Sequence, residues 1–139
     1  MITGWKSIWQ RWKVGMRGIA RYSWLNENPY NRNVGDCTVR AISTALDQDW
    51  DTTYWGMCLE GYLLKDMPSS NEVWRKYLSR FGLYRRKVPP GITVNEFART
   101  HPRGTYLLGL SSHVVCVIDG VLYDTWDSGE KEVLYYWKG

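Results

Sequence analysis

The sequence predicts an α+β fold, in which helices from the first part of the chain pack on an antiparallel sheet built by the last part. Between residues 37 and 100, apolar residues recur at helical spacing, and from residue 105 onward they come in short runs. The dipeptide Asp119-Gly120 separates two of these runs and is a strong signal for a two-residue hairpin. Helices followed by hairpin-connected strands are typical of the α+β class.

Length and composition indicate one domain preceded by a basic arm. We assign residues 1–22 to the arm and residues 23–139 to the domain, which is long enough to bury its own core. Three cysteines at scattered positions fit neither a disulfide framework nor a zinc site. We therefore expect reduced thiols, no metal or other cofactor, and a cytoplasmic protein. No stretch approaches the ~20 apolar residues of a membrane span, and we expect no signal peptide.

The arm combines a stripe of large apolar residues with positive charge. On a helix the stripe spans only about 80°, because its members follow one another at spacings of 4, 3, 4 and 3. The stripe consists of Trp5, Trp9, Trp12, Met16 and Ile19. Up to Arg21 the chain carries five basic residues and no acidic one. Since the formal net charge of the whole chain is +4, the rest of the chain has a net charge of −1. We expect a helix over Gly4–Tyr22 that docks on its own domain or on a second copy. A membrane surface and nucleic acid are alternative surfaces for such a helix.

The segment Val34–Ile42 predicts a loop that places Cys37 on the first turn of a buried helix. Asp36 is a good N-cap, and Gly35 allows a sharp turn into the helix. A thiol at a helix N-terminus feels the positive end of the helix dipole, which favours the nucleophilic thiolate. A buried cysteine with a purely structural role is the alternative.

Three further helices are expected before the sheet. The first has Asp51 as its cap and ends near Leu64. Its inward face is expected to consist of Trp55, Leu59, Tyr62 and Leu63. A capping-box pattern at Ser69 and Glu72 opens the next helix, which Gly82 ends. The third is a short helix capped by Thr93 and Glu96 that ends near Arg99. Between them, Leu83–Val88 is a candidate edge strand, because it carries Arg85, Arg86 and Lys87.

Four strands are expected to form the sheet. They are Thr105–Leu110, His113–Ile118, Val121–Trp126 and Glu132–Trp137. The hairpin pairs Ile118 with Val121 and Cys116 with Tyr123, which makes His113 and Asp124 diagonal neighbours on one face. An imidazole in catalysis needs a carboxylate or amide that fixes its tautomer. Asp124 is the candidate and Asp127 the fallback. Cys116 points to the other face as core packing, and His101 has no comparable setting.

These residues resemble papain-like cysteine peptidases. In that family a cysteine opens a helix early in the chain, a histidine follows on a strand, and an Asp or Asn follows on the next strand. Asp124-Thr125-Trp126 is similar to the Asn-Ser-Trp of papain, in which the tryptophan shields the hydrogen bond of the histidine. The approach Gly35-Asp36-Cys37 is closer to bacteriocin-processing peptidases and ovarian-tumour-type deubiquitinases. The resemblance covers Asn31–Trp137 and implies Cys37 as nucleophile, His113 as base and acid, and Asp124 as its orienting residue.

The sequence departs from the family at the oxyanion donor. Papain-like enzymes usually carry a glutamine a few residues before the cysteine, and none is present here. Asn31 and Asn33 are the candidate donors beside the backbone N–H of Cys37. The loss of one such donor lowers the rate by about 10²–10³.

The sequence therefore predicts thiol-dependent amide hydrolysis of a peptide or protein substrate, with a thioacyl intermediate. Deamidases and acyltransferases use the same three residues. A non-catalytic papain-like module that binds peptides through its many Trp and Tyr residues is the second hypothesis. A nucleic-acid role ranks third, because charge runs such as Arg85-Arg86-Lys87 are usually solvated. A phage or other mobile element is the context we guess for such a small domain with a basic arm.

Overall fold

The computed structural model describes residues 21–139. The apolar stripe of the arm lies in residues 1–20, outside the described part, so the structure does not test the expected arm helix. Tyr22, the last residue of that expected helix, instead begins the first strand, β1 (Tyr22–Trp24). Three residues are too few to show a strand periodicity, so this strand was missed.

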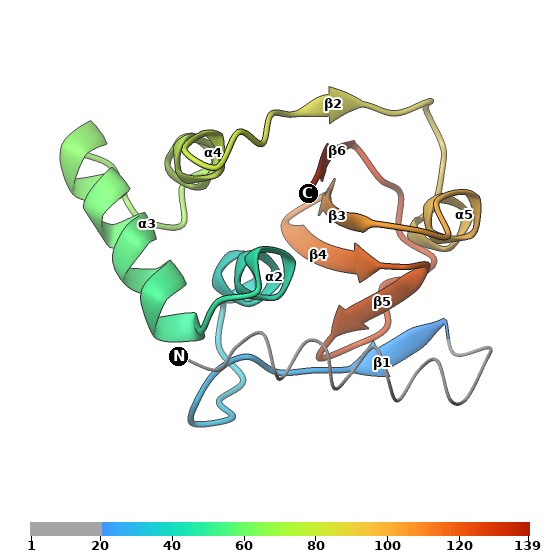
Figure 1. Ribbon diagram of the computed structural model, residues 1–139, viewed down its shortest axis with the longest axis horizontal. Helices are drawn as coiled ribbons and strands as arrows, with labels where there is room; N and C mark the ends of the chain where they lie inside the picture. Colours follow the sequence, from blue (N-terminus) through green and yellow to red (C-terminus); the bar gives the residue numbers. More distant parts are fainter. Residues whose placement is uncertain (1–20) are drawn as a thin grey trace.

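The sheet has six strands in the order β1-β5-β4-β3-β6-β2 (Figure 1). They are β1, β2 (Arg86–Lys87), β3 (Thr105–Leu110), β4 (His113–Ile118), β5 (Val121–Asp124) and β6 (Tyr135–Lys138). All neighbours are antiparallel except β1, which runs parallel to β5. The α+β class is confirmed, but the sheet is mixed rather than antiparallel because an N-terminal strand joins its edge.

The expected hairpin between β4 and β5 is present. Asp119 and Gly120 have φ values of 50° and 78°, as a type I′ turn requires. Cys116 pairs with Tyr123 and Ile118 with Val121, which confirms the predicted register. The strand after the turn is shorter than expected, and the last strand begins later than Glu132, which makes only an isolated bridge. The edge position predicted for Leu83–Val88 is confirmed by β2.

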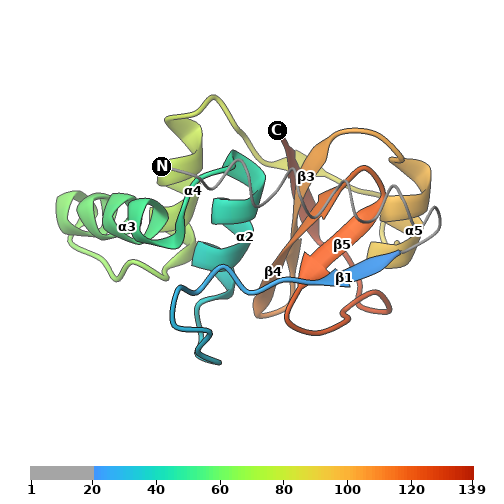
Figure 2. The same cartoon turned by 60° about the horizontal axis from the view of Figure 1, so that its bottom comes forward.

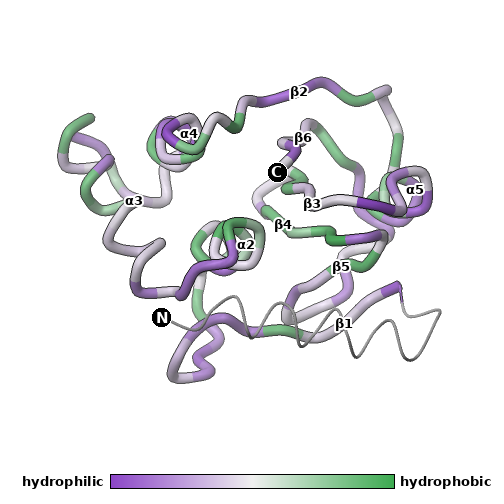
Figure 3. The backbone as a smooth tube through the Cα atoms, viewed as in Figure 1, coloured by the Kyte–Doolittle hydropathy of each residue, from purple (hydrophilic) through white to green (hydrophobic). Residues whose placement is uncertain are grey.

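Helices cover both faces of the sheet (Figure 2). On one face lies α2 (Cys37–Leu46), followed outward by α3 (Trp50–Leu64) and α4 (Asn71–Ser79), and on the other lies α5 (Val94–Thr100). Ile42 of α2 packs with Cys116 of β4 in one apolar cluster, and Phe97 of α5 packs with Val115 in a second. Apolar stretches on α2 and β4 are visible in Figure 3. Cys116 is fully buried, as expected for core packing.

Two helix caps differ from expectation. Asp49, not Asp51, caps α3, with its side chain accepting a hydrogen bond from Thr52 N at 2.8 Å. Ser70, one residue after the predicted Ser69, occupies the cap position of α4 but does not cap it, because its hydroxyl donates to Asp66. The capping box of Thr93 and Glu96 at α5 is confirmed.

The predicted inward face of α3 is wrong. Trp55, Leu59, Tyr62 and Leu63 are exposed, and the helix packs through Thr53, Met57, Glu60 and Gly61 instead. The physical reason is close approach: a Cβ on Gly56 would lie 2.3 Å from the Tyr77 ring of α4. The side of α3 with small residues therefore faces its neighbour, and the bulky side faces solvent. Within residues 21–139, no helix is both long and apolar enough to cross a bilayer.

Candidate active site

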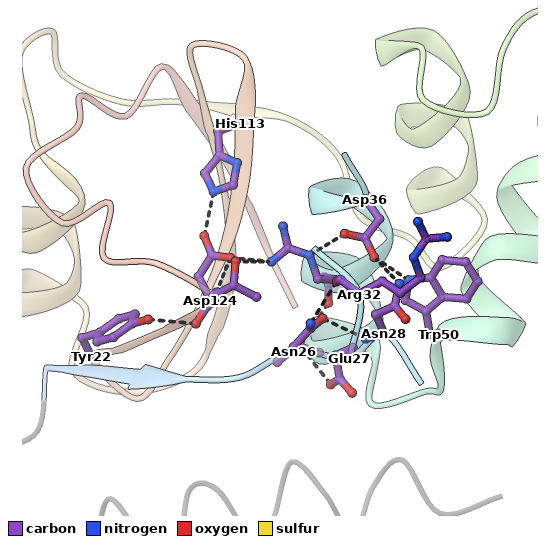
Figure 4. Close-up of polar contacts among 12 residues, drawn as sticks. Tyr22, Asn26, Glu27, Asn28, Arg32, Asp36, Trp50, His113 and Asp124 are labelled. Carbon is purple, nitrogen blue, oxygen red and sulfur yellow. Dashed lines mark hydrogen bonds and ion pairs between the residues drawn. The ribbon is translucent and has the colours of Figure 1, made fainter. Parts of the chain in front are cut away.

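Cys37 is the first residue of α2 and is partly buried at the end of the sheet. The preceding residue, Asp36, occupies the cap position as predicted, but its side chain makes no capping hydrogen bond. Its carboxylate instead accepts hydrogen bonds from Arg40 Nε at 2.7 Å, Trp50 Nε1 at 2.9 Å and Asn28 Nδ2 at 3.1 Å (Figure 4). Asp36 therefore fixes the loop in front of Cys37 to the helices behind it.

His113 and Asp124 meet where two neighbouring strands end. His113 is the first residue of β4 and Asp124 the last of β5, and His113 Nε2 lies 2.6 Å from Asp124 Oδ2. The other carboxylate oxygen, Oδ1, accepts hydrogen bonds from Arg40 Nη1 and from the backbone N–H of Thr125, both at 2.7 Å. Asp124 is only 5% exposed, and both of its carboxylate oxygens have hydrogen-bond partners.

The imidazole of His113 connects this carboxylate to the thiol. It is hydrogen bonded to both Asp124 and Cys37. Since Nε2 is the atom at Asp124, Nδ1 serves the thiol. The structure thus brings Cys37, His113 and Asp124 into one hydrogen-bonded chain, although they are 76 and 11 residues apart in sequence.

The electrostatics of this chain favour an ion pair. Burial lowers the pKa of His113, but the hydrogen bonds to Asp124 and Cys37 and the negative charge of both outweigh it and raise the pKa to about 9. Burial raises the pKa of Cys37, but the hydrogen bonds from His113 and from the Val114 backbone, together with nearby positive charge, bring it below its ordinary value. The lowered pKa of the Cys37 thiol and the raised pKa of the His113 imidazole together favour a thiolate beside an imidazolium.

Arg40 is the functional residue that sequence reasoning missed. The residue is 8% exposed, and its guanidinium joins Asp36 to Asp124 through two ion pairs of 2.7 Å. The spacing of Asp36 and Arg40, four residues apart on a helix, was a visible signal for the first pair. The second pair depends on how α2 meets β5, which no local pattern shows.

The structure also places Trp126 and Asp127, which the sequence singled out as possible partners of His113. The Trp126 ring lies 4.9 Å from the His113 ring, centroid to centroid, and is 43% exposed. Asp127, the fallback orienting residue, does not reach His113, because it forms an ion pair with Arg21.

Neither asparagine expected at the oxyanion site lines the cleft around Cys37. Asn31 Oδ1 accepts a hydrogen bond from Asn26 Nδ2 at 3.3 Å, and Asn33 is exposed on the same loop. Asn71, at the start of α4, does line the cleft. Its Oδ1 accepts from Trp74 Nε1 at 3.1 Å, which leaves its Nδ2 hydrogens for a ligand. No spacing rule in the sequence connects Asn71 to Cys37.

Two hollows meet at His113, and Cys37 lines the first of them. The first is lined by Gly35, Cys37, Thr38, Ser69, Asn71, Trp74, Gly109, Leu110, Ser112, His113, Val114 and Tyr135. The second shares Leu110, Ser112 and His113 with the first and is also lined by Ser111, Trp126, Lys131, Glu132 and Leu134. An extended ligand could therefore cross the site with its central atoms at Cys37.

Gly109 keeps the first hollow in shape. It pairs with Tyr135 across the sheet, and a Cβ on Gly109 would lie 2.4 Å from the Tyr135 ring. We expect Gly109→Ala to displace this ring and lower the free energy of unfolding by about 1–3 kcal/mol, as overpacking does. Gly35→Ala is the matched control, because a Cβ there has no neighbour within 4 Å. Denaturant unfolding of both variants checks this, and equal stabilities would show that Tyr135 yields freely.

Within residues 21–139, no group of three or more His, Cys, Asp or Glu side chains is placed to hold a metal ion. In comparisons with known proteins, no family model, curated protein or solved structure matches the chain. The chemistry of the site therefore has to be argued from its own geometry.

Proposed function

We propose that this protein is a papain-like cysteine peptidase that hydrolyses an amide bond of a peptide or protein substrate through a thioacyl intermediate on Cys37. The observation that carries the proposal is the continuous hydrogen-bonded chain from Cys37 through His113 to Asp124, at a position where His113 borders two hollows. Papain-like membership, rather than an unrelated thiol site, rests on the chain order and on Trp126 beside His113.

Each residue has one task in this reaction. The Cys37 thiolate attacks the carbonyl carbon, and the charge that develops on the carbonyl oxygen meets the unpaired N–H groups at the start of α2. The imidazolium of His113 gives its proton to the leaving amine, so that the C–N bond breaks and a thioester remains. His113 then accepts a proton from water, which attacks the thioester and releases the acid.

Hydrolysis is favoured over transfer to another amine by access of water. The second hollow reaches His113 from the side of Trp126, which gives water a route to the thioester. A deamidase would use the same steps on a side-chain amide. Cys37, Cys58 and Cys116 form no disulfide, and we place the enzyme in the cytoplasm, where thiols stay reduced.

The pH dependence of Cys37 alkylation tests the proposal. With iodoacetamide and mass spectrometry, we expect Cys37 to be alkylated at pH values below the usual thiol pKa of about 8.5, because its own pKa is lowered. In His113→Ala the imidazolium is lost, and a thiol with the usual pKa is only about 3% ionised at pH 7, so alkylation at pH 7 should become slower and its pH profile should move to higher pH. Identical profiles in the two proteins would refute the ion pair and the proposal with it.

Two further readouts complete the test. Cys58 lies on α3 outside the cleft and serves as the internal control, whose alkylation should be the same in both proteins. Hydrolysis of a peptide should decline above about pH 9, because His113 then loses the proton that the leaving amine needs.

A further inference from the structure

The side of α3 that faces solvent is apolar. Trp55, Leu59, Tyr62 and Leu63 are 72%, 59%, 68% and 55% exposed. They stand at positions i, i+4, i+7 and i+8, so they share one side of the helix, which we call the α3 outer face. An exposed apolar surface of this kind marks a site of interaction, because water disfavours it.

The surroundings of the α3 outer face are acidic. The chain from residue 47 to residue 66 carries Asp47, Asp49, Asp51, Glu60 and Asp66 against one basic residue, Lys65. Glu60 is paired with Arg80, and the Lys65 ammonium lies over the Tyr62 ring at 3.9 Å from its centroid. The segment as a whole carries a net negative charge, which favours a basic partner and disfavours a second α3.

The N-terminal arm has the complementary properties. Its stripe from Trp5 to Ile19 repeats the spacing of an apolar helix face, and its charged residues up to Arg21 are all basic. As a helix, the stripe would be about 21 Å long, and the 15 residues of α3 span about 22 Å. The two apolar faces match in length and are opposite in charge.

We propose that the α3 outer face binds the apolar stripe of the N-terminal arm of a second copy of this chain. The arm of the same chain is attached at the sheet, on the side of α2 that faces away from α3. Arg21 is hydrogen bonded to Asp127 and to Asn95 of α5. Ile19 is two residues before Arg21, so even a fully extended chain separates them by at most about 7 Å. In Figures 1 and 2, α2 lies between α3 and the sheet to which Arg21 is attached. Reciprocal exchange of arms gives a closed dimer with two equal contacts.

Charge substitutions in the two surfaces test the exchange. In sedimentation equilibrium we expect the wild-type chain to be a dimer, and Leu59→Glu and Trp9→Glu each to weaken dimerisation by about 30-fold or more, as at an interface hot spot. Tyr30→Glu is the control for the domain, because Tyr30 is 85% exposed and lies off α3. Ser7→Glu is the control for the arm, because residue 7 falls opposite the stripe on a helix. Both controls should remain dimeric.

Mixing the two interface variants gives the sharpest result. A Leu59→Glu chain keeps an intact arm, and a Trp9→Glu chain keeps an intact α3 outer face. Together they can form one of the two contacts, so the mixture should form a heterodimer more tightly than either variant forms a homodimer. Alkylation of Cys37 should be unchanged in Leu59→Glu, which shows that this variant is folded, because Leu59 does not line the cleft.

Three results would overturn the proposal. A monomeric wild-type chain would leave the α3 outer face without this occupant. If Leu59→Glu abolished the dimer while Trp9→Glu did not, α3 would pair with α3 of the second copy. If neither substitution changed the dimer, another surface would form it.

Discussion

Replacing Arg40 with methionine is expected to lower the free energy of unfolding by about 3–5 kcal/mol, the usual cost of removing one partner from a buried ion pair. The guanidinium is buried and holds Asp36 and Asp124 together, so its removal leaves two buried carboxylates short of a partner. For a domain of this length we expect the melting temperature to fall by roughly 10–20 °C. Thermal and urea unfolding of both proteins measure this.

Arg75→Met is the matched control. Arg75 also pairs with an acidic residue on its own helix, but its partner Glu72 has a side chain that is 71% exposed and lies 3.4 Å away. An exposed pair of this kind contributes about 0–1 kcal/mol. An equal loss in the two variants would show that Arg40 contributes no more than a surface residue.

The stability difference caused by Arg40→Met should also depend on pH. Burial raises the pKa of Asp124, but hydrogen bonds from His113, Thr125 and Arg40 outweigh it and hold the pKa below its ordinary value. A carboxyl with a lowered pKa contributes stability above the unfolded pKa of about 3.9 and loses it as the pH falls through the folded value. The gap between wild type and variant should therefore narrow in acid.

Arg40 links the loop before Cys37 to the carboxylate that orients His113. Asp36 is held by Arg40, Asn28 and Trp50, and Asp124 is held by Arg40 and Thr125 (Figure 4). A shift of the loop would thus be transmitted to the thiol and to the imidazole at once. We infer that Arg40 acts as a positioning residue, and that its conservative variant Arg40→Lys keeps the charge but loses the fork that reaches both carboxylates.

The parts of the fold that sequence could predict are those fixed by local physics. The type I′ turn at Asp119-Gly120 follows from two residues that tolerate positive φ, and the register of Cys116 with Tyr123 follows from the turn. The capping box at Thr93 is likewise a contact within one turn of helix. Because His113 and Asp124 lie on adjacent strands of this hairpin, their meeting could be predicted as well.

The rest depends on which distant surfaces meet. The sequence of α3 has apolar residues on one side, and a helix in isolation offers no reason for that side to face solvent. Gly56 and Gly61 allow close contact with Tyr77 and with the chain at Asp66, and this tight packing decides the orientation. The cleft position of Asn71 and the parallel pairing of β1 with β5 also arise from long-range contacts.

Asp124→Asn is expected to impair the reactivity of Cys37 strongly, although papain carries an asparagine at the position that Asp124 resembles. Oδ1 of Asp124 receives two donors, Arg40 Nη1 and the Thr125 N–H, so an asparagine must place its carbonyl oxygen there. Its Nδ2 would then occupy the position of Oδ2, 2.6 Å from His113 Nε2. An N–H donor at this position requires Nε2 to carry no proton, so the imidazolium cannot form and the neutral ring keeps its proton on Nδ1, facing the thiol.

The expected result is loss of the thiolate at neutral pH. Cys37 alkylation at pH 7 should slow towards the rate of a thiol with the usual pKa, and any peptide hydrolysis should fall about 10⁴-fold, as when the same exchange imposes the wrong tautomer in a serine protease. Asp124→Ala is the informative comparison, because it removes the carboxylate without placing a donor at Nε2. We expect Cys37 to react faster at pH 7 in Asp124→Ala than in Asp124→Asn, although alanine removes more of the side chain than asparagine does. The opposite order, or a wild-type pH profile in Asp124→Asn, would mean that Arg40 and Thr125 do not control the orientation of this side chain.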